Sequence, residues 1–306
     1  MTIQQSHLTE TARRRSTENR HALQLALMHL NRERLTPATP SESWREDVVR
    51  TAQLTLREGE FLESERRAVT QRAAESPRDV GAFVAWFEAL RERGPGQFDP
   101  LFDFLAERAS VEQVRWFVRQ EVAGEAGFDD LVALTQLRLP DRPKLELARN
   151  YWDEMGRGKQ PGMHGPMLAR LAEALDARAN DPSRIVWESL AVGNLLAGLA
   201  YNRRYAWHSL GALGAVELTA PTRAVKVVEA LERVGLEGEA VYYFKLHSTI
   251  DVVHWNGWRD EALLPVVSAQ PELMPWLAEG ALMRLAAGAR AFERYRREFG
   301  LSGDFS

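Results

Sequence analysis

The sequence has no cysteine among its 306 residues. This absence excludes disulfides, iron-sulfur clusters, thiolate metal ligands and a cysteine nucleophile, so any bound metal must be held by nitrogen and oxygen atoms. It also favours a reducing compartment, since disulfides are typical of oxidising ones. We therefore expect a cytoplasmic protein.

An excess of positive charge and long apolar runs are missing as well. The chain has 39 Lys+Arg against 43 Asp+Glu, a formal net charge of -4, and so offers no overall positive field to a phosphate backbone. No stretch approaches the roughly 18 uninterrupted apolar residues of a membrane span. Residues 1–20 are largely polar and lack the apolar segment of a signal peptide. We expect neither a nucleic-acid partner nor a membrane partner.

The residues that are present indicate a globular, all-α protein. Hydrophobic residues make up 45% of the chain and charged residues 27%, which is enough apolar material for a sizeable core. Apolar residues recur at helical spacing, as in residues 82–90, whereas the alternation typical of strands never persists. Ser110 and Gln113 have capping-box spacing, and Gly156 and Gly235 stand where helices should end.

Prolines suggest where the elements divide. Two prolines among small polar residues at 35–43 predict a linker, because they cannot extend a helix. The linker would separate an N-terminal helical arm, residues 1–43 with the linker included, from a helical bundle of residues 44–306. Pro182 and Pro221 are interpreted as helix starts. We expect one bundle, since no fixed repeat is present, and we expect the arm to form a homodimer contact.

The strongest chemical signal is the spacing H-x3-D-x2-H formed by His247, Asp251 and His254. On a helix these three side chains fall within an arc of about 60°, so their tips can converge on one metal ion. Imidazole and carboxylate suit iron, manganese or zinc when thiolates are absent. The alternative is a pair of packed histidines with an aspartate that orients one of them.

Two further segments could present ligands to the same interior. Glu154 ends a predicted helix, and His164 follows after a Gly/Pro-rich break, so the two could face each other across a bend. The alternative for this pair is a surface carboxylate and a loop histidine. Glu217 lies among small and apolar residues, where an unpaired carboxylate is costly and must pair, take up a proton or bind metal. Its alternative is an exposed residue in a last helical turn.

A fourth carboxylate comes from residues 111–125, which carry Glu121 and Glu125. Helical phase places Glu121 closer than Glu125 to the apolar face defined by Phe117, so Glu121 is the predicted ligand and Glu125 its rival. The candidate set then has four carboxylates and three imidazoles, and four negative charges neutralise two divalent cations. Pairs of metal ions held in this way are known from carboxylate-bridged proteins. The candidate ligands are Glu121, Glu154, His164, Glu217, His247, Asp251 and His254.

In the order and spacing of these residues the chain resembles the heme-oxygenase-like diiron oxidases, also described as iron-containing redox enzymes. The resemblance covers about residues 110–258 and is carried, in this order, by Glu121, the E-x9-H of Glu154 and His164, Glu217, and the H-x3-D-x2-H of residues 247–254. It implies a heme-oxygenase-like helical bundle with a non-heme diiron cofactor in place of heme. The N-terminal arm has no counterpart in this pattern, and the E-x-x-H spacing of ferritins is absent.

The resemblance further implies an O2-dependent oxidase or oxygenase with two Fe ions. Family members N-oxygenate amines and guanidines, cleave amino-acid C–C bonds or decarboxylate fatty acids. We expect a small-molecule substrate, an amine or amino-acid derivative, and an external electron donor. Two alternatives stay open, namely a metal-free helical interaction protein with a buried polar network, and a zinc or manganese hydrolase.

Overall fold

The computed structural model describes residues 3–125 and 127–301, with side chains from residue 16 onward. The described residues contain helices and no strand, and one isolated antiparallel bridge joins Met155 to Met163. The all-α prediction is confirmed. The α-helices are α1 Ile3–Leu35, α2 Trp44–Ala74, α3 Val80–Arg93, α4 Pro100–Glu107, α5 Val111–Glu125, α6 Phe128–Thr135, α7 Asp141–Glu154, α8 His164–Ala174, α9 Trp187–Tyr201, α10 Ala206–Arg233, α11 Glu239–Gly257, α12 Leu264–Ala269 and α13 Met274–Glu298.

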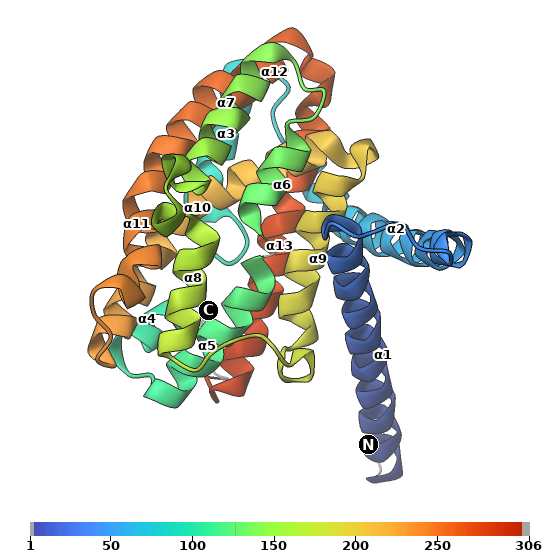
Figure 1. Cartoon of the computed structure of the whole chain (residues 1–306), viewed down its shortest axis with the longest axis vertical. Helices are drawn as coiled ribbons and strands as arrows, with labels where there is room; N and C mark the ends of the chain where they lie inside the picture. Colours follow the sequence, from blue (N-terminus) through green and yellow to red (C-terminus); the bar gives the residue numbers. More distant parts are fainter. Residues whose placement is uncertain (1–2, 126, 302–306) are drawn as a thin grey trace.

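The centre of the bundle is formed by α9, α10 and α13 (Figure 1). Helix α10 packs against α11 and α13 and also contacts α4 and α9. Every residue from 188 to 200 of α9 is buried, as expected of a helix that is apolar on all sides. The first half of α10 is likewise buried and rich in glycine and alanine, so neighbouring helices can approach it closely.

Glycines set the closest helix crossing. A Cβ atom at Gly211 of α10 would lie 2.1 Å from the carbonyl oxygen of Leu277, and one at Gly280 of α13 would lie 2.0 Å from that of His208. The two glycines therefore let the backbones of α10 and α13 touch, which fixes these helices relative to each other.

Most of the predicted helix boundaries are found. Ser110 and Gln113 form a reciprocal capping box, with the Gln113 amide nitrogen 3.3 Å from Ser110 Oγ and the Ser110 amide donating to Gln113 Oε1 at 2.8 Å. Gly156 and Gly235 follow the last residues of α7 and α10 with φ of 63° and 93°. Left-handed backbone is the usual reason for glycine at this position.

The predictions that Pro182 and Pro221 begin helices need correction. Pro182 begins only the short 3-10 turn Pro182–Arg184. Pro221 begins nothing, because α10 runs through it from Ala206 to Arg233. A proline has no amide hydrogen to donate to the carbonyl four residues earlier, which here belongs to Glu217. Packing of α10 on both sides outweighs this loss, since residues 208–215 and Ala224 are buried in the core.

Helices α1 and α2 are joined by residues 36–43, which are not helical. Helix α1 lies along α9 (Figure 1), where Asn31 Nδ2 donates to Asn194 Oδ1 at 2.9 Å. A buried ion pair with 2.7 Å between Arg34 Nη2 and Glu58 Oε1 connects α1 to α2. None of the helices in the described part of the chain has both the length and the apolar character that crossing a bilayer requires.

Candidate metal centre

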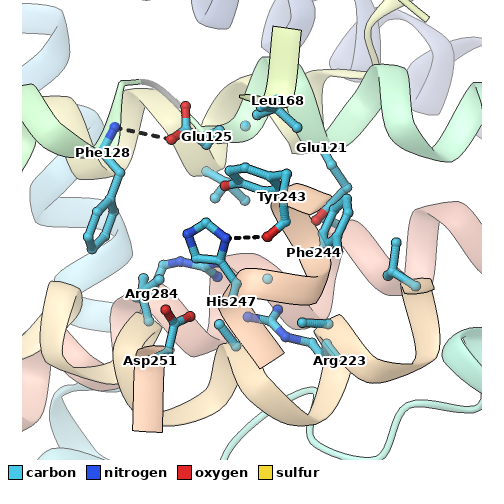
Figure 2. A pocket seen from close by; sticks show the side chains of 18 of the residues that line it. Glu121, Glu125, Phe128, Leu168, Arg223, Tyr243, Phe244, His247, Asp251 and Arg284 are labelled. Carbon is cyan, nitrogen blue, oxygen red and sulfur yellow. Dashed lines mark hydrogen bonds between the residues drawn. The ribbon is translucent and has the colours of Figure 1, made fainter. Parts of the chain in front are cut away.

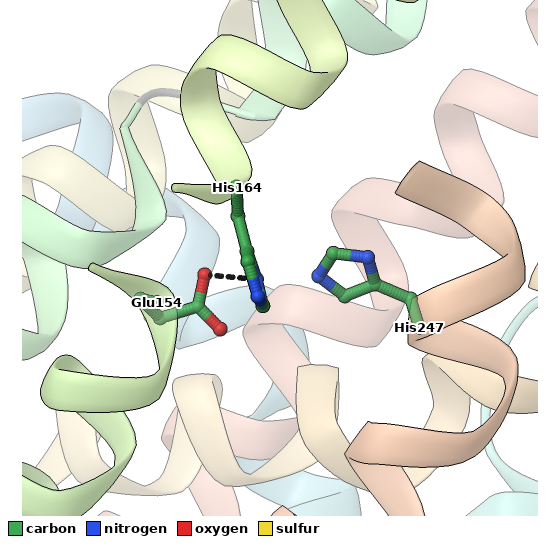
Figure 3. A group of neighbouring side chains, drawn as sticks. All are labelled: Glu154, His164 and His247. Carbon is green, nitrogen blue, oxygen red and sulfur yellow. Dashed lines mark ion pairs between the residues drawn. The ribbon is translucent and has the colours of Figure 1, made fainter. Parts of the chain in front are cut away.

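A first group of three ligands lies between α7, α8 and α11 (Figure 3). Glu154, His164 and His247 each offer one ligand atom, and these atoms lie within 4.8 Å of one another. Glu154 Oε2 is 2.7 Å from His164 Nδ1, and the rings of His164 and His247 have centroids 4.7 Å apart. Three donors at these separations can surround a single cation.

A second group shares one member with the first. Glu154, Glu217 and His254 also offer ligand atoms within 4.8 Å of one another. Glu217 Oε2 on α10 lies 3.4 Å from His254 Nδ1 on α11. Because Glu154 belongs to both groups, its two carboxylate oxygens can serve two neighbouring ions, as in carboxylate-bridged metal pairs.

The loop between α7 and α8 explains how Glu154 meets His164. Gly156 takes a φ of 63°, and a Cβ atom there would lie 2.3 Å from the carbonyl carbon of Gly162. The loop is therefore folded tightly on itself, and the bridge between Met155 and Met163 closes it. As a result the last residue of α7 lies beside the first residue of α8.

The histidines of the first group are held in the neutral form that binds metal. Burial, together with the positive charge of neighbouring His254, lowers the pKa of His164 to about 4. Burial, with His164 nearby, lowers the pKa of His247 to about 4. His247 Nδ1 donates to the carbonyl oxygen of Tyr243 at 2.7 Å, which leaves Nε2 free to ligate. A backbone carbonyl on the distal nitrogen is typical of metal-bound histidine.

The carboxylates of the site are buried close together, and this raises the pKa of two of them. Burial, followed by the charge of Glu217, raises the pKa of both Glu154 and Asp251 well above the ordinary value. Burial alone would lower the pKa of His254, but Glu217, Glu154 and Asp153 outweigh it and raise that pKa to about 9. In the absence of metal, protons therefore occupy this interior.

Buried polar atoms without a hydrogen bond indicate whether the residues of the site fit a metal. The buried atoms His164 Nδ1, His254 Nδ1 and Asp251 Oδ1 make no hydrogen bond of suitable geometry, and the two histidine nitrogens instead lie 2.7 Å from Glu154 Oε2 and 3.4 Å from Glu217 Oε2. Buried polar atoms are nearly always paired, so each such atom needs an explanation. These atoms belong to imidazoles and a carboxylate without thiolate, a donor set that suits iron. The residues present fit a metal centre.

Five of the seven predicted ligands belong to the two groups, whereas Asp251 and Glu121 belong to neither. Asp251 is buried and its Oδ1 is 3.9 Å from His254 Nδ1, so it adjoins the second group. Glu121 is outside both groups, and its Oε1 accepts a hydrogen bond from Tyr295 Oη at 3.4 Å. Burial raises the pKa of Glu121, against the opposing charges of Arg223 and Arg284.

Glu125, the alternative to Glu121, interacts electrostatically with members of the two ligand groups. Burial raises its pKa, hydrogen bonds from the backbone amides of Gly127 and Phe128 lower it, and the charge of His164 lowers it as well. Glu125 is also among the main charges that raise the pKa of Glu154.

Sequence reasoning did not find the groups that orient the ligands. Asn150 Nδ2 donates to Glu217 Oε1 at 2.6 Å, and Asp153 Oδ2 lies 3.4 Å from His254 Nε2. A signal for Asn150 was available, because it stands four residues before Glu154 and thus on the same face of α7. Asp153 carried no comparable signal.

A cavity of about 140 Å³ adjoins the ligands (Figure 2). Glu154, Glu217, His247 and Asp251 form one side of it. Much of the remaining lining is apolar, with charged groups from α5, α10 and α13. The apolar lining includes Phe102, Phe128, Leu168, Val192, Leu196, Phe244 and Phe292.

Comparison with solved structures finds a CADD-like protein of unknown function from Nostoc punctiforme. Its structure at 2.00 Å resolution is 21% identical and gives a TM-score of 0.47, with 78% of this chain and 97% of that chain covered. Its structure at 1.35 Å resolution is 20% identical with the same TM-score, over 80% and 99% of the two chains. No curated protein matches the chain.

A family model described as iron-containing redox enzyme matches residues 115–289. The match includes α7 to α11, and hence both ligand groups. It covers more than half of the 306 residues. The chain belongs to the iron-containing redox enzymes, a family with a heme-oxygenase-like fold.

Proposed function

We propose that the protein is a non-heme diiron oxidase or oxygenase that uses O2 to oxidise a small organic metabolite, an amine or amino-acid derivative. The observation that carries the proposal is the sharing of Glu154 between two groups of ligand atoms. In this proposal His164 and His247 would hold one ion, Glu217 and His254 would hold the other, and Glu154, which belongs to both groups, would serve both. Asp251 and Glu125 complete the set, with Glu125 favoured over Glu121.

When bound, the two irons would activate O2 and an external donor would supply electrons. The chain itself keeps His164 and His247 neutral and aims His247 Nε2 through the hydrogen bond to the Tyr243 carbonyl. Asn150 holds Glu217 by its Oε1 atom. The apolar cavity wall excludes water from the side on which a substrate would lie.

The test is anaerobic loading of the full-length protein with Fe(II), followed by iron analysis and admission of O2. We expect two irons per chain and O2 uptake that depends on Fe(II). His247→Ala should lower both, whereas His29→Ala, at an exposed position of α1, should change neither. Two bound irons without O2 uptake would contradict an oxidase. Purified protein with no stoichiometric metal would favour the polar-network alternative, and bound zinc with hydrolytic activity would favour a hydrolase.

A further inference from the structure

Two arginines line the cavity beside the proposed metal centre without an acidic partner in contact. Arg223 comes from α10 and Arg284 from α13, and both reach into the cavity that His247 and Asp251 border (Figure 2). Neither guanidinium makes a hydrogen bond or an ion pair within 4.0 Å to any described residue, and the Nε atoms of both are buried without a partner. A cation in such surroundings is costly unless something pairs with it.

Helix α13 holds both guanidinium groups in place. Arg284 lies across Gly288, where a Cβ atom would be 2.7 Å from Arg284 Nη1. The Arg223 guanidinium lies over the ring of Phe292, with its Cζ 5.4 Å from the ring centroid. Positions 284, 288 and 292 are successive turns of one helix face. The two cations are thus directed at the cavity by the packing of α13.

The charges around the two arginines do not balance. Burial, followed by the charge of Arg223, lowers the pKa of Arg284 to about 10, which still leaves it protonated at neutral pH. Glu121 faces both guanidinium groups and can neutralise one of them. Asp251 also faces Arg223, but its carboxylate belongs to the proposed metal ligands. One positive charge therefore remains uncompensated at this end of a largely apolar cavity.

We propose that Arg223 and Arg284 bind the carboxylate of the substrate, whose apolar body lies in the cavity next to His247. The proposal rests on the diiron function proposed above and narrows its substrate class to small monocarboxylates, which include amino-acid derivatives but exclude amines that lack a carboxylate. A guanidinium fork matches a carboxylate in shape and charge. A dianion is disfavoured, because Glu125, Glu154, Glu217 and Asp251 surround the same space.

The size of the cavity limits the substrate. The volume of about 140 Å³ is close to that of an engineered cavity of roughly 150 Å³ that holds benzene. The substrate, with its carboxylate included, should therefore have about six to eight non-hydrogen atoms. Hexanoate is a suitable probe, and hexanamide and hexan-1-amine have the same chain with a neutral or a positive end.

The experiment is calorimetric titration of the full-length protein with these three probes, both as purified and after anaerobic iron loading. We expect hexanoate to bind at least about tenfold more tightly than hexanamide, and hexan-1-amine to bind no better than the amide. Arg223→Gln and Arg284→Gln should each weaken hexanoate binding by about tenfold, and Arg284→Lys by less. Arg294→Gln, on α13 but paired with Glu298 outside the cavity, is the matched control and should bind as the parent does.

Two outcomes would overturn the proposal. One is equal binding of hexanoate and hexanamide by the parent protein. The other is hexanoate binding that requires iron and survives both Arg→Gln substitutions, since the carboxylate would then occupy the metal. Circular dichroism checks each variant for folding, and Arg284→Lys keeps the test valid if a Gln variant does not fold.

Iron analysis of the same samples separates this proposal from the diiron function. Selective hexanoate binding without stoichiometric iron would support the arginine site and contradict the diiron centre. Two irons per chain without a preference for hexanoate over hexanamide would support the diiron centre and contradict the arginine site.

Discussion

Glu154 occupies the position on which the proposed centre depends. It ends α7, and the tight Gly156–Gly162 loop places it beside His164. Among the described residues it is the one shared by both groups of ligand atoms. The other ligands each serve one group, so substitutions at different ligands should have different effects on metal content.

The first prediction therefore compares Glu154→Gln with His254→Ala. Loss of the shared carboxylate charge should abolish binding of both irons, whereas His254→Ala leaves the group of Glu154, His164 and His247 complete and should retain about one iron per chain. The measurement is the iron-to-protein ratio after anaerobic loading and gel filtration. Glu173→Gln, at an exposed site on α8, is the control and should bind as the parent does. Equal iron content in the two site variants would contradict a shared carboxylate.

Helical phase predicted the site more securely within one helix than between helices. The spacing of His247, Asp251 and His254 predicts a common helix face; His247 and His254 belong to the two ligand groups, and Asp251 lies beside the second. Helical phase favoured Glu121 over Glu125, but both line the cavity on the inward side of α5. Their difference comes from other helices, since Tyr295 of α13 contacts Glu121. Contacts between distant segments cannot be obtained from the spacing within one helix.

At the scale of elements, the crossing of α10 and α13 positions both the proposed metal ligand Glu217 and the two cavity arginines. Gly211 and Gly280 allow this crossing because a side chain at either would meet the backbone of the other helix. Neither glycine was singled out from the sequence, because a small residue in a helix does not reveal which partner packs against it.

The second prediction is that Gly211→Ala separates these helices. The added Cβ would lie 2.1 Å from the Leu277 carbonyl oxygen, so the backbone must move. We expect a loss of about 1–3 kcal/mol or more in the free energy of unfolding, measured by urea denaturation. Gly59→Ala is the control, since no atom lies within 4 Å of a Cβ at this position of α2. It should be neutral or stabilising by about 0.5–1 kcal/mol. Equal stability of Gly211→Ala and the parent would argue against the close crossing.

A buried polar cluster joins the same helices to α2. Glu279 of α13 accepts a hydrogen bond from Thr70 at 2.9 Å and lies 3.1 Å from His208 Nε2 and 3.5 Å from Arg66 Nη1. Burial alone would raise the pKa of Glu279, but the hydrogen bonds from His208 and Thr70 outweigh burial, and the pKa is lowered from 4.5. The ionised carboxylate is thus the form that the folded protein stabilises.

The third prediction follows from the sign of that shift. A lowered pKa in the folded state contributes stability above the ordinary value of 4.5, and this contribution is lost as pH falls through the folded-state pKa. Glu279→Gln should therefore lower the free energy of unfolding by about 1–3 kcal/mol at pH 7. The difference from the parent should shrink below pH 4.5. Urea unfolding of both proteins across this range measures it. A difference that is constant with pH would show that the charge of Glu279 makes no contribution.

For the whole molecule, composition and helical periodicity predicted the all-α class, and the order of the ligand motifs indicated the family. Pro221 shows that local sequence preferences do not predict every helix boundary. A proline is a good predictor of a helix start when only local preferences act, yet α10 continues through it. Burial of α10 along both α11 and α13 is a property of the assembled bundle. Substrate-facing residues such as Arg223 and Arg284 also became visible only in the assembled cavity.

The last prediction concerns the stability of the whole fold. Burial and the charge of Glu217 raise the pKa of Glu154 and Asp251 well above the ordinary value, so folding at neutral pH requires proton uptake that costs stability, and bound cations would remove this cost. Iron that binds only the folded state at 100 times its dissociation constant adds about 2.7 kcal/mol. For a chain of this size the melting temperature should rise by roughly 5 °C. Anaerobic differential scanning fluorimetry with Fe(II) or with a chelator measures the shift. The double variant His247→Ala with His254→Ala should lose most of it, and a shift of full size in that variant would place the stabilising ion elsewhere in the chain.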